Sequence, residues 1–275
     1  MRIQLTLQHL PEAKVDFNYQ YQVSSWIYKT LAQADGDFAE WLHQQGYVYG
    51  KRAYRLFTFG KLQPRRYSID QKNRMLVLLE NTSTLTLSFY VPETMQHFVT
   101  GLFEQQRFRL GSPRYAVDFE VQMVRILPPP LFKETMRYRC ESPMLISKQV
   151  EGNPYPQYLA PDAPDYASLL LQNLLRKWRA WQRVTALSNE APLEESLPHG
   201  VPFGFSLLST PRSKLLRVKK TELRGYEFSF ELTAPIELHE IGYYAGFGEK
   251  NAAAGMGMVQ VVRDGNTQVR KNAVL

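Results

Sequence analysis

The fold is decided by residues 2–34, RIQLTLQHLPEAKVDFNYQYQVSSWIYKTLAQA, which hold two different spacings of apolar residues. Over residues 2–9 apolar and polar side chains alternate, and this period of two is typical of a half-buried strand. Over residues 19–34 apolar side chains recur at a spacing of four, which is the pattern of a helix with one buried face. The chain therefore opens with a strand followed by a helix.

Up to residue 127 the predicted elements continue this alternation. Asp35-Gly36-Asp37 ends the first helix and caps a short second one, which stops at Gly46. Segments rich in β-branched and aromatic residues follow, and Pro92 opens another helix with an apolar stripe. The expected strands are Tyr54–Leu62, Met75–Leu79, Leu85–Tyr90, Phe108–Leu110 and Tyr115–Leu127. The order strand, helix, strands, helix, strand is the split β-α-β arrangement of a ferredoxin-like domain.

The second half repeats this order more loosely, after a stiff connector at Pro128-Pro129-Pro130. Asp165 caps a long helix from Tyr166 to about Val184, and Pro235 starts a short one. Strands are expected over residues 131–140, 144–150, 203–208, 214–220, 222–233 and 256–262. We predict an α+β protein of two tandem ferredoxin-like (RRM-like) βαββαβ domains, residues 1–127 and 128–275.

Composition excludes several classes of protein. Apolar residues make up 44% of the 275 residues, which is enough for a core and unlike a disordered chain. Charges interrupt every window long enough to span a bilayer, and residues 1–25 do not resemble a secretory signal. The single cysteine, Cys140, excludes an internal disulfide and disfavours a cysteine-based zinc site. We expect a soluble, cytoplasmic protein.

The net charge of +7 is moderate, but the basic residues are clustered. Residues 51–74 carry eight basic side chains against one acidic, and residues 212–224 carry six against one. A third group lies in the helix at residues 176–183. Clusters in both halves of the chain suggest an extended polyanion that lies across both, although a run of charge is often only a solvated face.

A glycine-rich segment, GFGEKNAAAGMG, occupies residues 246–257. Glycines allow positive φ and close backbone approach, so that N–H groups can gather around a phosphate, and Lys250 and Asn251 add a charge and a donor. A dinucleotide-binding turn must follow the first strand of a βαβ unit, whereas this segment follows a helix near the end of the sequence. A phosphate loop of the Walker type is excluded because no Gly-Lys-Ser/Thr occurs.

With this segment the chain resembles the RNA-processing proteins of CRISPR systems that belong to the RAMP superfamily, specifically the endoribonuclease that cuts precursor RNA within each repeat. The motifs that carry the resemblance are GFGEKN…GMGMV, Trp26-Ile27-Tyr28, Trp41-Leu42-His43, Leu56-Phe57-Thr58-Phe59 and Glu141-Ser142-Pro143. The resemblance implies two ferredoxin-like domains, repeat RNA in a basic cleft between them, and cleavage without a metal or cofactor to a 2′,3′-cyclic phosphate and a 5′-hydroxyl. One residue more than usual separates the two glycine pairs here.

Four residues are the candidates for catalysis: His43, Tyr28, Arg55 and Lys51. Histidine suits proton transfer near neutral pH, and His43 ends a short helix just before the densest basic cluster. The resemblance gives His43 and Tyr28 the positions of the family's histidine and tyrosine, and Arg55 that of a lysine. An arginine can grip phosphate oxygens but cannot donate a proton, so Lys51 is the alternative cation.

The other ionisable residues offer less. We expect structural or surface roles for His9, His97, His199 and His239. No HxH, HxxxH or CxxC spacing occurs, which disfavours a metal site. For RNA binding, the candidates are Gly246, Gly248, Lys250, Asn251, Gly255, Gly257, Arg52, Arg212, Lys214, Lys219 and Lys220.

Three functions remain open from the sequence. The leading one is an endoribonuclease acting on CRISPR repeat RNA. A catalytically inactive subunit that holds the processed RNA (crRNA) in an effector complex would share the glycine segment, and the resemblance allows other Cas proteins or a second copy of the chain as partners. A pair of domains that binds a small molecule would show no salt-dependent affinity for RNA.

Overall fold

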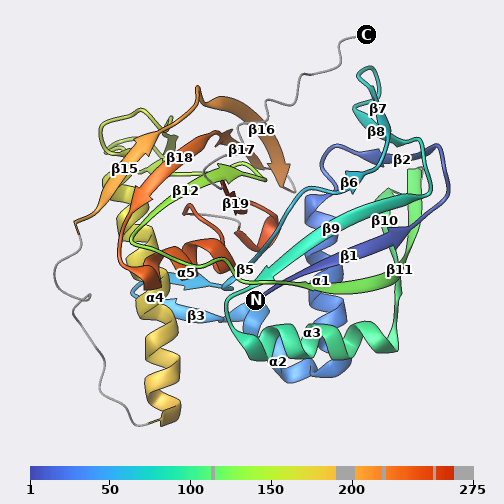
Figure 1. Ribbon diagram of the computed structural model, residues 1–275, viewed down its shortest axis with the longest axis horizontal. Helices are drawn as coiled ribbons and strands as arrows, with labels where there is room; N and C mark the ends of the chain where they lie inside the picture. The colour runs from blue at the N-terminus through green and yellow to red at the C-terminus, as the bar shows by residue number, and fades with distance from the viewer. Residues whose placement is uncertain (113–114, 190–201, 219–220, 250–251, 263–275) are drawn as a thin grey trace.

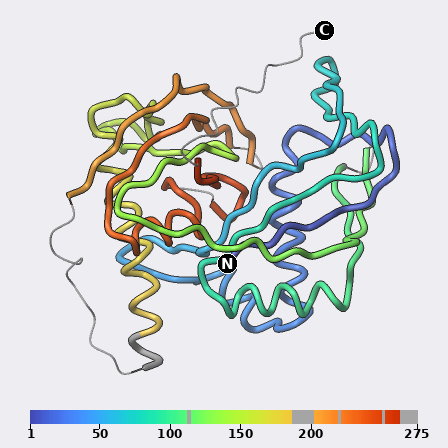
Figure 2. The backbone as a smooth tube through the Cα atoms, viewed as in Figure 1, coloured from blue at the N-terminus to red at the C-terminus, as the bar shows by residue number. Residues whose placement is uncertain are grey.

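The computed structural model describes residues 1–112, 115–189, 202–218, 221–249 and 252–262 (Figures 1 and 2). Two antiparallel sheets, each with its own helices, lie side by side in Figure 1. The first sheet is formed by the chain up to Leu127, and the second by the chain from Thr135 onward, so the three consecutive prolines lie between them. None of the helices in the described ranges combines the length and apolar composition needed to cross a membrane.

The N-terminal sheet has the strand order β10-β11-β1-β9-β5. Its strands are β1 (Arg2–Gln8), β5 (Phe57–Phe59), β9 (Thr82–Phe89), β10 (Arg107–Ser112) and β11 (Tyr115–Leu127), and the short β6 (Gln63–Pro64) also pairs with β9. Two helices, α1 (Gln20–Ala34) and α3 (Pro92–Glu104), follow the first strand and the third main strand. The four strands β11-β1-β9-β5 therefore have the order 4-1-3-2 of a ferredoxin-like domain, as the sequence predicts.

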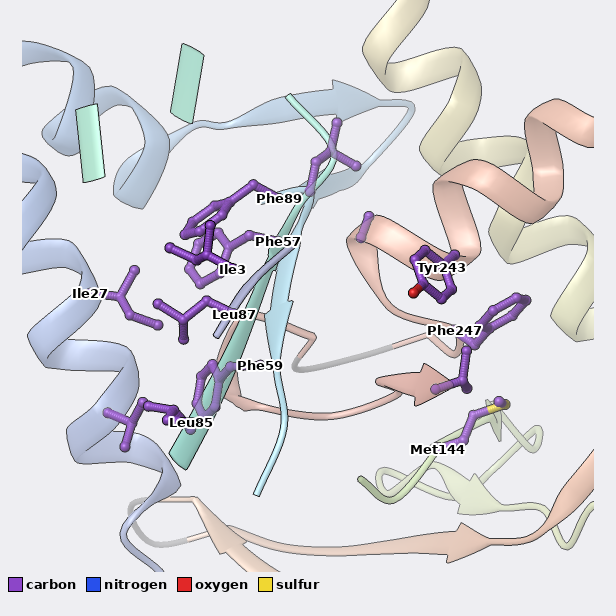
Figure 3. Close-up of a cluster of buried hydrophobic side chains, with 14 of the residues drawn as sticks. Ile3, Ile27, Phe57, Phe59, Leu85, Leu87, Phe89, Met144, Tyr243 and Phe247 are labelled. Atoms are coloured by element: carbon purple, nitrogen blue, oxygen red, sulfur yellow. The ribbon is translucent and has the colours of Figure 1, made fainter. Parts of the chain in front are cut away.

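The predicted alternation in β1 places Ile3, Leu5 and Leu7 fully inside the protein, where Figure 3 shows Ile3 in a cluster with Ile27 of α1 and Leu87 of β9. The helices α1 and α3 cross closely because Gly101 lacks a side chain. A Cβ on Gly101 would lie 1.9 Å from the carbonyl oxygen of Thr30. One face of β1 and one face of each helix thus form a single core.

The C-terminal sheet has the strand order β15-β18-β12-β19. Its elements are β12 (Thr135–Cys140), α4 (Tyr166–Asn189), β15 (Gly204–Leu207), β18 (Ser229–Thr233), α5 (Ile236–Ala245) and β19 (Val259–Val261). This is again the 2-3-1-4 order of a ferredoxin-like domain, so the predicted pair of such domains is confirmed. A hairpin of β16 (Arg212–Val218) and β17 (Thr221–Glu227) is inserted between the second and third strands.

Several predicted boundaries were wrong. The expected strand 144–150 is reduced to the two-residue β13 (Ser147–Lys148), which pairs with β14 (Gln157–Tyr158), and to an isolated bridge between Met144 and Tyr226. The expected strand 54–62 is broken at Leu56, whose φ of +52° turns the chain, so that only β5 joins the sheet. The expected strand Met75–Leu79 is present as β8 (Met75–Leu78), but its partners β2 (Ala13–Asp16) and β7 (Tyr67–Asp70) were not predicted. The hairpin of β3 (Tyr47–Tyr49) and β4 (Arg52–Tyr54) was not predicted either.

The two domains share a buried interface along β5 and the glycine segment. Thr58 donates a hydrogen bond of 2.9 Å from its Oγ1 to the carbonyl oxygen of Met256. A Cβ on Gly255 would lie 2.4 Å from the ring of Phe59. Arg2, in the first strand of the N-terminal sheet, donates from its guanidinium to the carbonyl oxygens of Val259 and Tyr243. The position of one domain is therefore fixed by backbone atoms of the other.

Candidate active site and nucleic-acid interface

His43 lies in the last turn of α2 (Gly36–Gln44), and its side chain is exposed. The helix begins where the Asp35 carboxylate accepts a hydrogen bond of 2.8 Å from the backbone N–H of Phe38. It ends before Gly46, which has a φ of +59° and leaves no room for a Cβ beside the carbonyl oxygen of Tyr54. Both ends of α2 are thus determined by local sequence, and together they place the imidazole at the surface.

Tyr28, from α1, lies against His43. The two ring centroids are 4.8 Å apart and the rings are nearly perpendicular, while the other side of Tyr28 contacts Phe57 of β5. Burial raises the pKa of the Tyr28 hydroxyl to about 12, although Arg55 acts in the opposite direction. The hydroxyl therefore keeps its proton at neutral pH and can donate a hydrogen bond.

Arg55 completes this group from the segment between β4 and β5. Its guanidinium donates to the carbonyl oxygens of His43 at 2.6 Å and Gln45 at 3.0 Å. A cation at this position satisfies carbonyls that a helix leaves unpaired at its C-terminus and opposes the helix dipole. The structure therefore brings Tyr28, His43 and Arg55 together, and it shows Arg55 as a support of the turn that carries His43.

Lys51 lies at the exposed turn between β3 and β4, a hairpin that we call the β3–β4 hairpin (residues 47–54). The next residue, Arg52, forms an ion pair with Glu249 of the glycine segment. The Glu249 carboxylate also accepts hydrogen bonds of 2.9 Å from the backbone N–H and the hydroxyl of Ser147. The hairpin that follows His43 is thus tied to the glycine segment of the other domain.

The four glycines of the glycine segment are buried, and each has a positive φ between +73° and +96°. The backbone N–H of Gly257 donates to the carbonyl oxygen of Pro143 at 2.9 Å, and that of Gly255 donates within the segment to Ala252. The short helix η1 (Ala252–Ala254) contacts both β5 and α1, the helix that carries Tyr28. These glycines are needed for close packing, and their contact with phosphate stays a prediction, while Lys250 and Asn251 lie outside the described residues.

The inserted β16–β17 hairpin presents exposed basic side chains at Arg212, Lys214 and Arg224. It also reaches the N-terminal domain, because Glu227 pairs with Lys61 and the backbone N–H of Arg217 donates to Asn18 at 3.2 Å. The hairpin therefore extends from the C-terminal domain to the N-terminal domain, and its basic residues could contact one polyanion that spans both. Lys219 and Lys220 lie outside the described residues.

The remaining histidines have structural contacts where the structure describes them. His9 and His239 are buried, and each ring nitrogen has a hydrogen-bond partner. Burial lowers the pKa of both imidazoles. His97 packs on Phe38 at a centroid distance of 4.6 Å, and His199 lies outside the described residues. Within the described ranges, no three side chains of His, Cys, Asp and Glu gather in a way that could hold a metal ion.

Comparison with known proteins agrees with this geometry. Two family models match the chain in succession: "CRISPR-associated protein Cas6, N-terminal" over residues 14–125 and "CRISPR associated protein Cas6, C-terminal" over residues 127–261. A protein of Methanocaldococcus jannaschii named CRISPR-associated endoribonuclease Cas6 1 is 30% identical over 274 residues, which cover 98% of this chain and 96% of that protein. The chain belongs to the Cas6 family.

Two solved structures show that the fold also matches. A Cas6-related protein from Pyrococcus furiosus superposes with a TM-score of 0.78 at 23% identity, over 96% of this chain and 99% of that one. A structure described as an RAMP protein binding different RNA substrates superposes with a TM-score of 0.74 at 20% identity, over 96% of this chain and all of the other. At these identities the likeness shows the fold alone. The predicted family is confirmed.

In this Cas6 chain the N-terminal family model covers Tyr28, His43, Lys51 and Arg55, and the C-terminal one covers the glycine segment. Sequence reasoning missed one charged residue that contacts that segment. Lys177 of α4 is buried, and its ammonium binds carbonyl oxygens of the glycine segment. The available signal was its spacing, because Lys177 falls three residues after Leu174 and seven after Leu170, on the apolar stripe of the helix.

Proposed function

We propose that this Cas6 chain is an endoribonuclease that cuts CRISPR repeat RNA without a metal ion. The observation that carries the proposal is that Tyr28 and Arg55 both contact the exposed His43 or its turn. This group lies next in sequence to the β3–β4 hairpin, whose Arg52 forms an ion pair with Glu249 of the glycine segment. The name of the Methanocaldococcus relative and the RNA-binding RAMP structure of the same fold support it. The proposed substrate is a repeat RNA that lies across both domains.

In the proposed reaction the 2′-oxygen beside the scissile phosphate attacks phosphorus, and the bond from phosphorus to the 5′-oxygen breaks. The products are a 2′,3′-cyclic phosphate and a 5′-hydroxyl. His43 is exposed and is the proposed proton-transfer residue: the 2′-hydroxyl loses its proton and the leaving 5′-oxygen gains one, and an imidazole can serve as base for the first transfer or acid for the second. Tyr28 orients the imidazole or the phosphate through a hydroxyl that stays protonated. Arg55, or Lys51 as the alternative cation, provides positive charge near the phosphate.

The test is cleavage of labelled repeat RNA in the presence of EDTA. Wild type should release a product ending in a cyclic phosphate, and His43→Ala should cut about 10²- to 10⁴-fold more slowly while it still binds RNA. His97→Ala, which removes a histidine packed on Phe38, is the matched control and should cut at nearly the wild-type rate. A 2′-deoxy substitution at the cut site should abolish cleavage and leave binding unchanged.

Two results would contradict the proposal. Cleavage that needs a divalent cation would refute the metal-independent mechanism. Binding of repeat RNA by wild type without any cleavage would identify the chain as an inactive RNA-holding subunit instead. Partnership with other Cas proteins and formation of a homodimer remain predictions from the family resemblance.

A further inference from the structure

A buried lysine of α4 holds the backbone of the glycine segment. Lys177 is 2% exposed, and its Nζ donates to the carbonyl oxygen of Gly248 at 2.9 Å and to that of Gly246. Both acceptor residues have a positive φ, +84° for Gly246 and +96° for Gly248. A chain of such glycines has several accessible conformations, and the two hydrogen bonds select one of them.

Packing alone does not require a lysine at this position. Its neighbours on the apolar stripe of α4 include Leu170, Leu174 and Trp178, all buried. An ammonium moved out of water into such surroundings loses hydration, and burial lowers the pKa of Lys177 to about 7. No carboxylate in the described part of the chain forms an ion pair with it. The polar contacts of the Lys177 ammonium are thus its hydrogen bonds to the two carbonyl oxygens.

The same helix also holds the β3–β4 hairpin, which begins four residues after His43 (Figure 1). Arg179 donates to the hydroxyl of Tyr49 at 3.2 Å, and the guanidinium groups of Arg179 and Arg183 each lie 5.7 Å from the centre of the Tyr49 ring. A single rigid element therefore contacts both the hairpin beside the candidate active site and the glycine segment. The Arg52–Glu249 ion pair connects the two directly.

We propose that Lys177 is a positioning residue that fixes the glycine segment relative to the β3–β4 hairpin, so that bound repeat RNA presents its scissile phosphate to His43. This inference rests on the proposed function. Removal of the ammonium leaves the buried carbonyl oxygens of Gly246 and Gly248 without this donor, and among the described residues the same peptide groups are then held only on their N–H side, by Gly257 and Leu145. RNA then meets a segment whose donors are less firmly fixed. The expected defect is in RNA affinity and in the position of the cut, and the proton transfers at His43 are unaffected.

The experiment compares Lys177→Met, which keeps the length and loses the charge, with Lys177→Arg, which keeps a charge. Affinity for repeat RNA is measured in a His43→Ala background so that the RNA stays intact, and the cleavage rate is measured at saturating RNA with His43 present. We expect Lys177→Met to weaken binding about tenfold or more, to change the saturating rate less than threefold, and to produce additional cut sites. Lys177→Arg should recover at least part of the affinity.

Thermal unfolding of each variant separates positioning from a merely structural role. A lower Tm for Lys177→Met with unchanged RNA affinity and a single cut site would overturn the inference. Should Lys177→Met not fold, Lys177→Gln decides in its place, because its amide can still donate a hydrogen bond inside the protein but carries no charge, and it should weaken RNA binding about two- to threefold or more. Unchanged affinity in Lys177→Gln would then overturn the inference. Wild type that does not bind repeat RNA overturns the proposed function itself, whereas normal binding by wild type and Lys177→Met alike overturns only the role of Lys177.

Discussion

At the scale of single residues, the sequence indicated Tyr28 and His43 but not Lys177, and the reason is physical. A histidine at the end of a short helix and a tyrosine in a family motif can be recognised as candidate site residues from the local sequence. A lysine in a helix with several other basic residues resembles a solvated face, and its burial depends on carbonyl oxygens about 70 positions further along the chain. Contacts of that kind arise only when elements far apart in the sequence, here α4 and the segment after α5, pack together within the C-terminal domain.

The buried ammonium of Lys177 predicts a dependence of stability on pH. In the unfolded chain the lysine keeps its proton up to a pKa of 10.5, whereas burial lowers the pKa in the folded protein to about 7. Between these values the unfolded state binds more protons, so the free energy of unfolding rises with pH, by at most about 1.4 kcal/mol per pH unit. Urea unfolding of wild type and Lys177→Met at pH 7, 8 and 9 measures this term as the difference between the two proteins. A difference that stays constant over this range would contradict the prediction.

At the scale of elements, the end of α2 depends on Arg55. The helix has no intrahelical donors for its last carbonyl groups, and the guanidinium of Arg55 supplies donors from a residue outside the helix. Since His43 belongs to this turn, fraying of α2 would move the imidazole away from Tyr28. The stabilising and the chemical roles of Arg55 can be separated by substitution.

Arg55→Met should lower the free energy of unfolding by about 1 kcal/mol, because two charge-assisted hydrogen bonds and a favourable dipole interaction are lost. It should also slow cleavage at saturating RNA. Arg55→Lys, the matched variant, keeps the charge near the helix end and should recover most of the stability. Chemical unfolding measures the change in stability, and single-turnover cleavage measures the change in rate. If Arg55→Met cuts slowly but is as stable as wild type, Arg55 contacts the phosphate and does not stabilise the end of α2.

The strands around Arg55 show where element prediction from sequence fails. The apolar residues from Tyr54 to Leu62 have the composition of one strand, and they form two short ones in different sheets. The break comes at Leu56, because its φ of +52° is a conformation that leucine rarely adopts and that no local pattern announces. By contrast, β1, α1, α3 and β11 were predicted closely, since each has a long and regular apolar period.

At the scale of the whole molecule, the β16–β17 hairpin carries exposed basic side chains and connects the C-terminal domain to the N-terminal domain. If these side chains contact phosphates, each contact releases counterions when RNA binds. The salt dependence of binding then counts the contacts independently of the RNA sequence.

We expect Arg212→Gln and Lys214→Gln each to weaken binding of repeat RNA and to reduce the slope of log Kd against log salt concentration by about 0.7 to 0.9. The matched control is Arg109→Gln, because Arg109 lies on β10 of the N-terminal sheet and forms an ion pair with Asp118 at 2.6 Å. The control should leave the slope unchanged. Equal slopes for all three variants and wild type would place the RNA elsewhere on the protein.

The packing of the β3–β4 hairpin on α4 has a consequence for exchange of parts between relatives. The hairpin belongs to the N-terminal domain by sequence, yet its Tyr49 rests on arginines of the C-terminal domain. A chimera joined at the three prolines would therefore pair a hairpin from one parent with a helix from the other. A C-terminal domain exchanged together with residues 47–54 would keep the contacts between this hairpin and α4, and the contacts of β1 and β5 with the C-terminal domain would still join two parents.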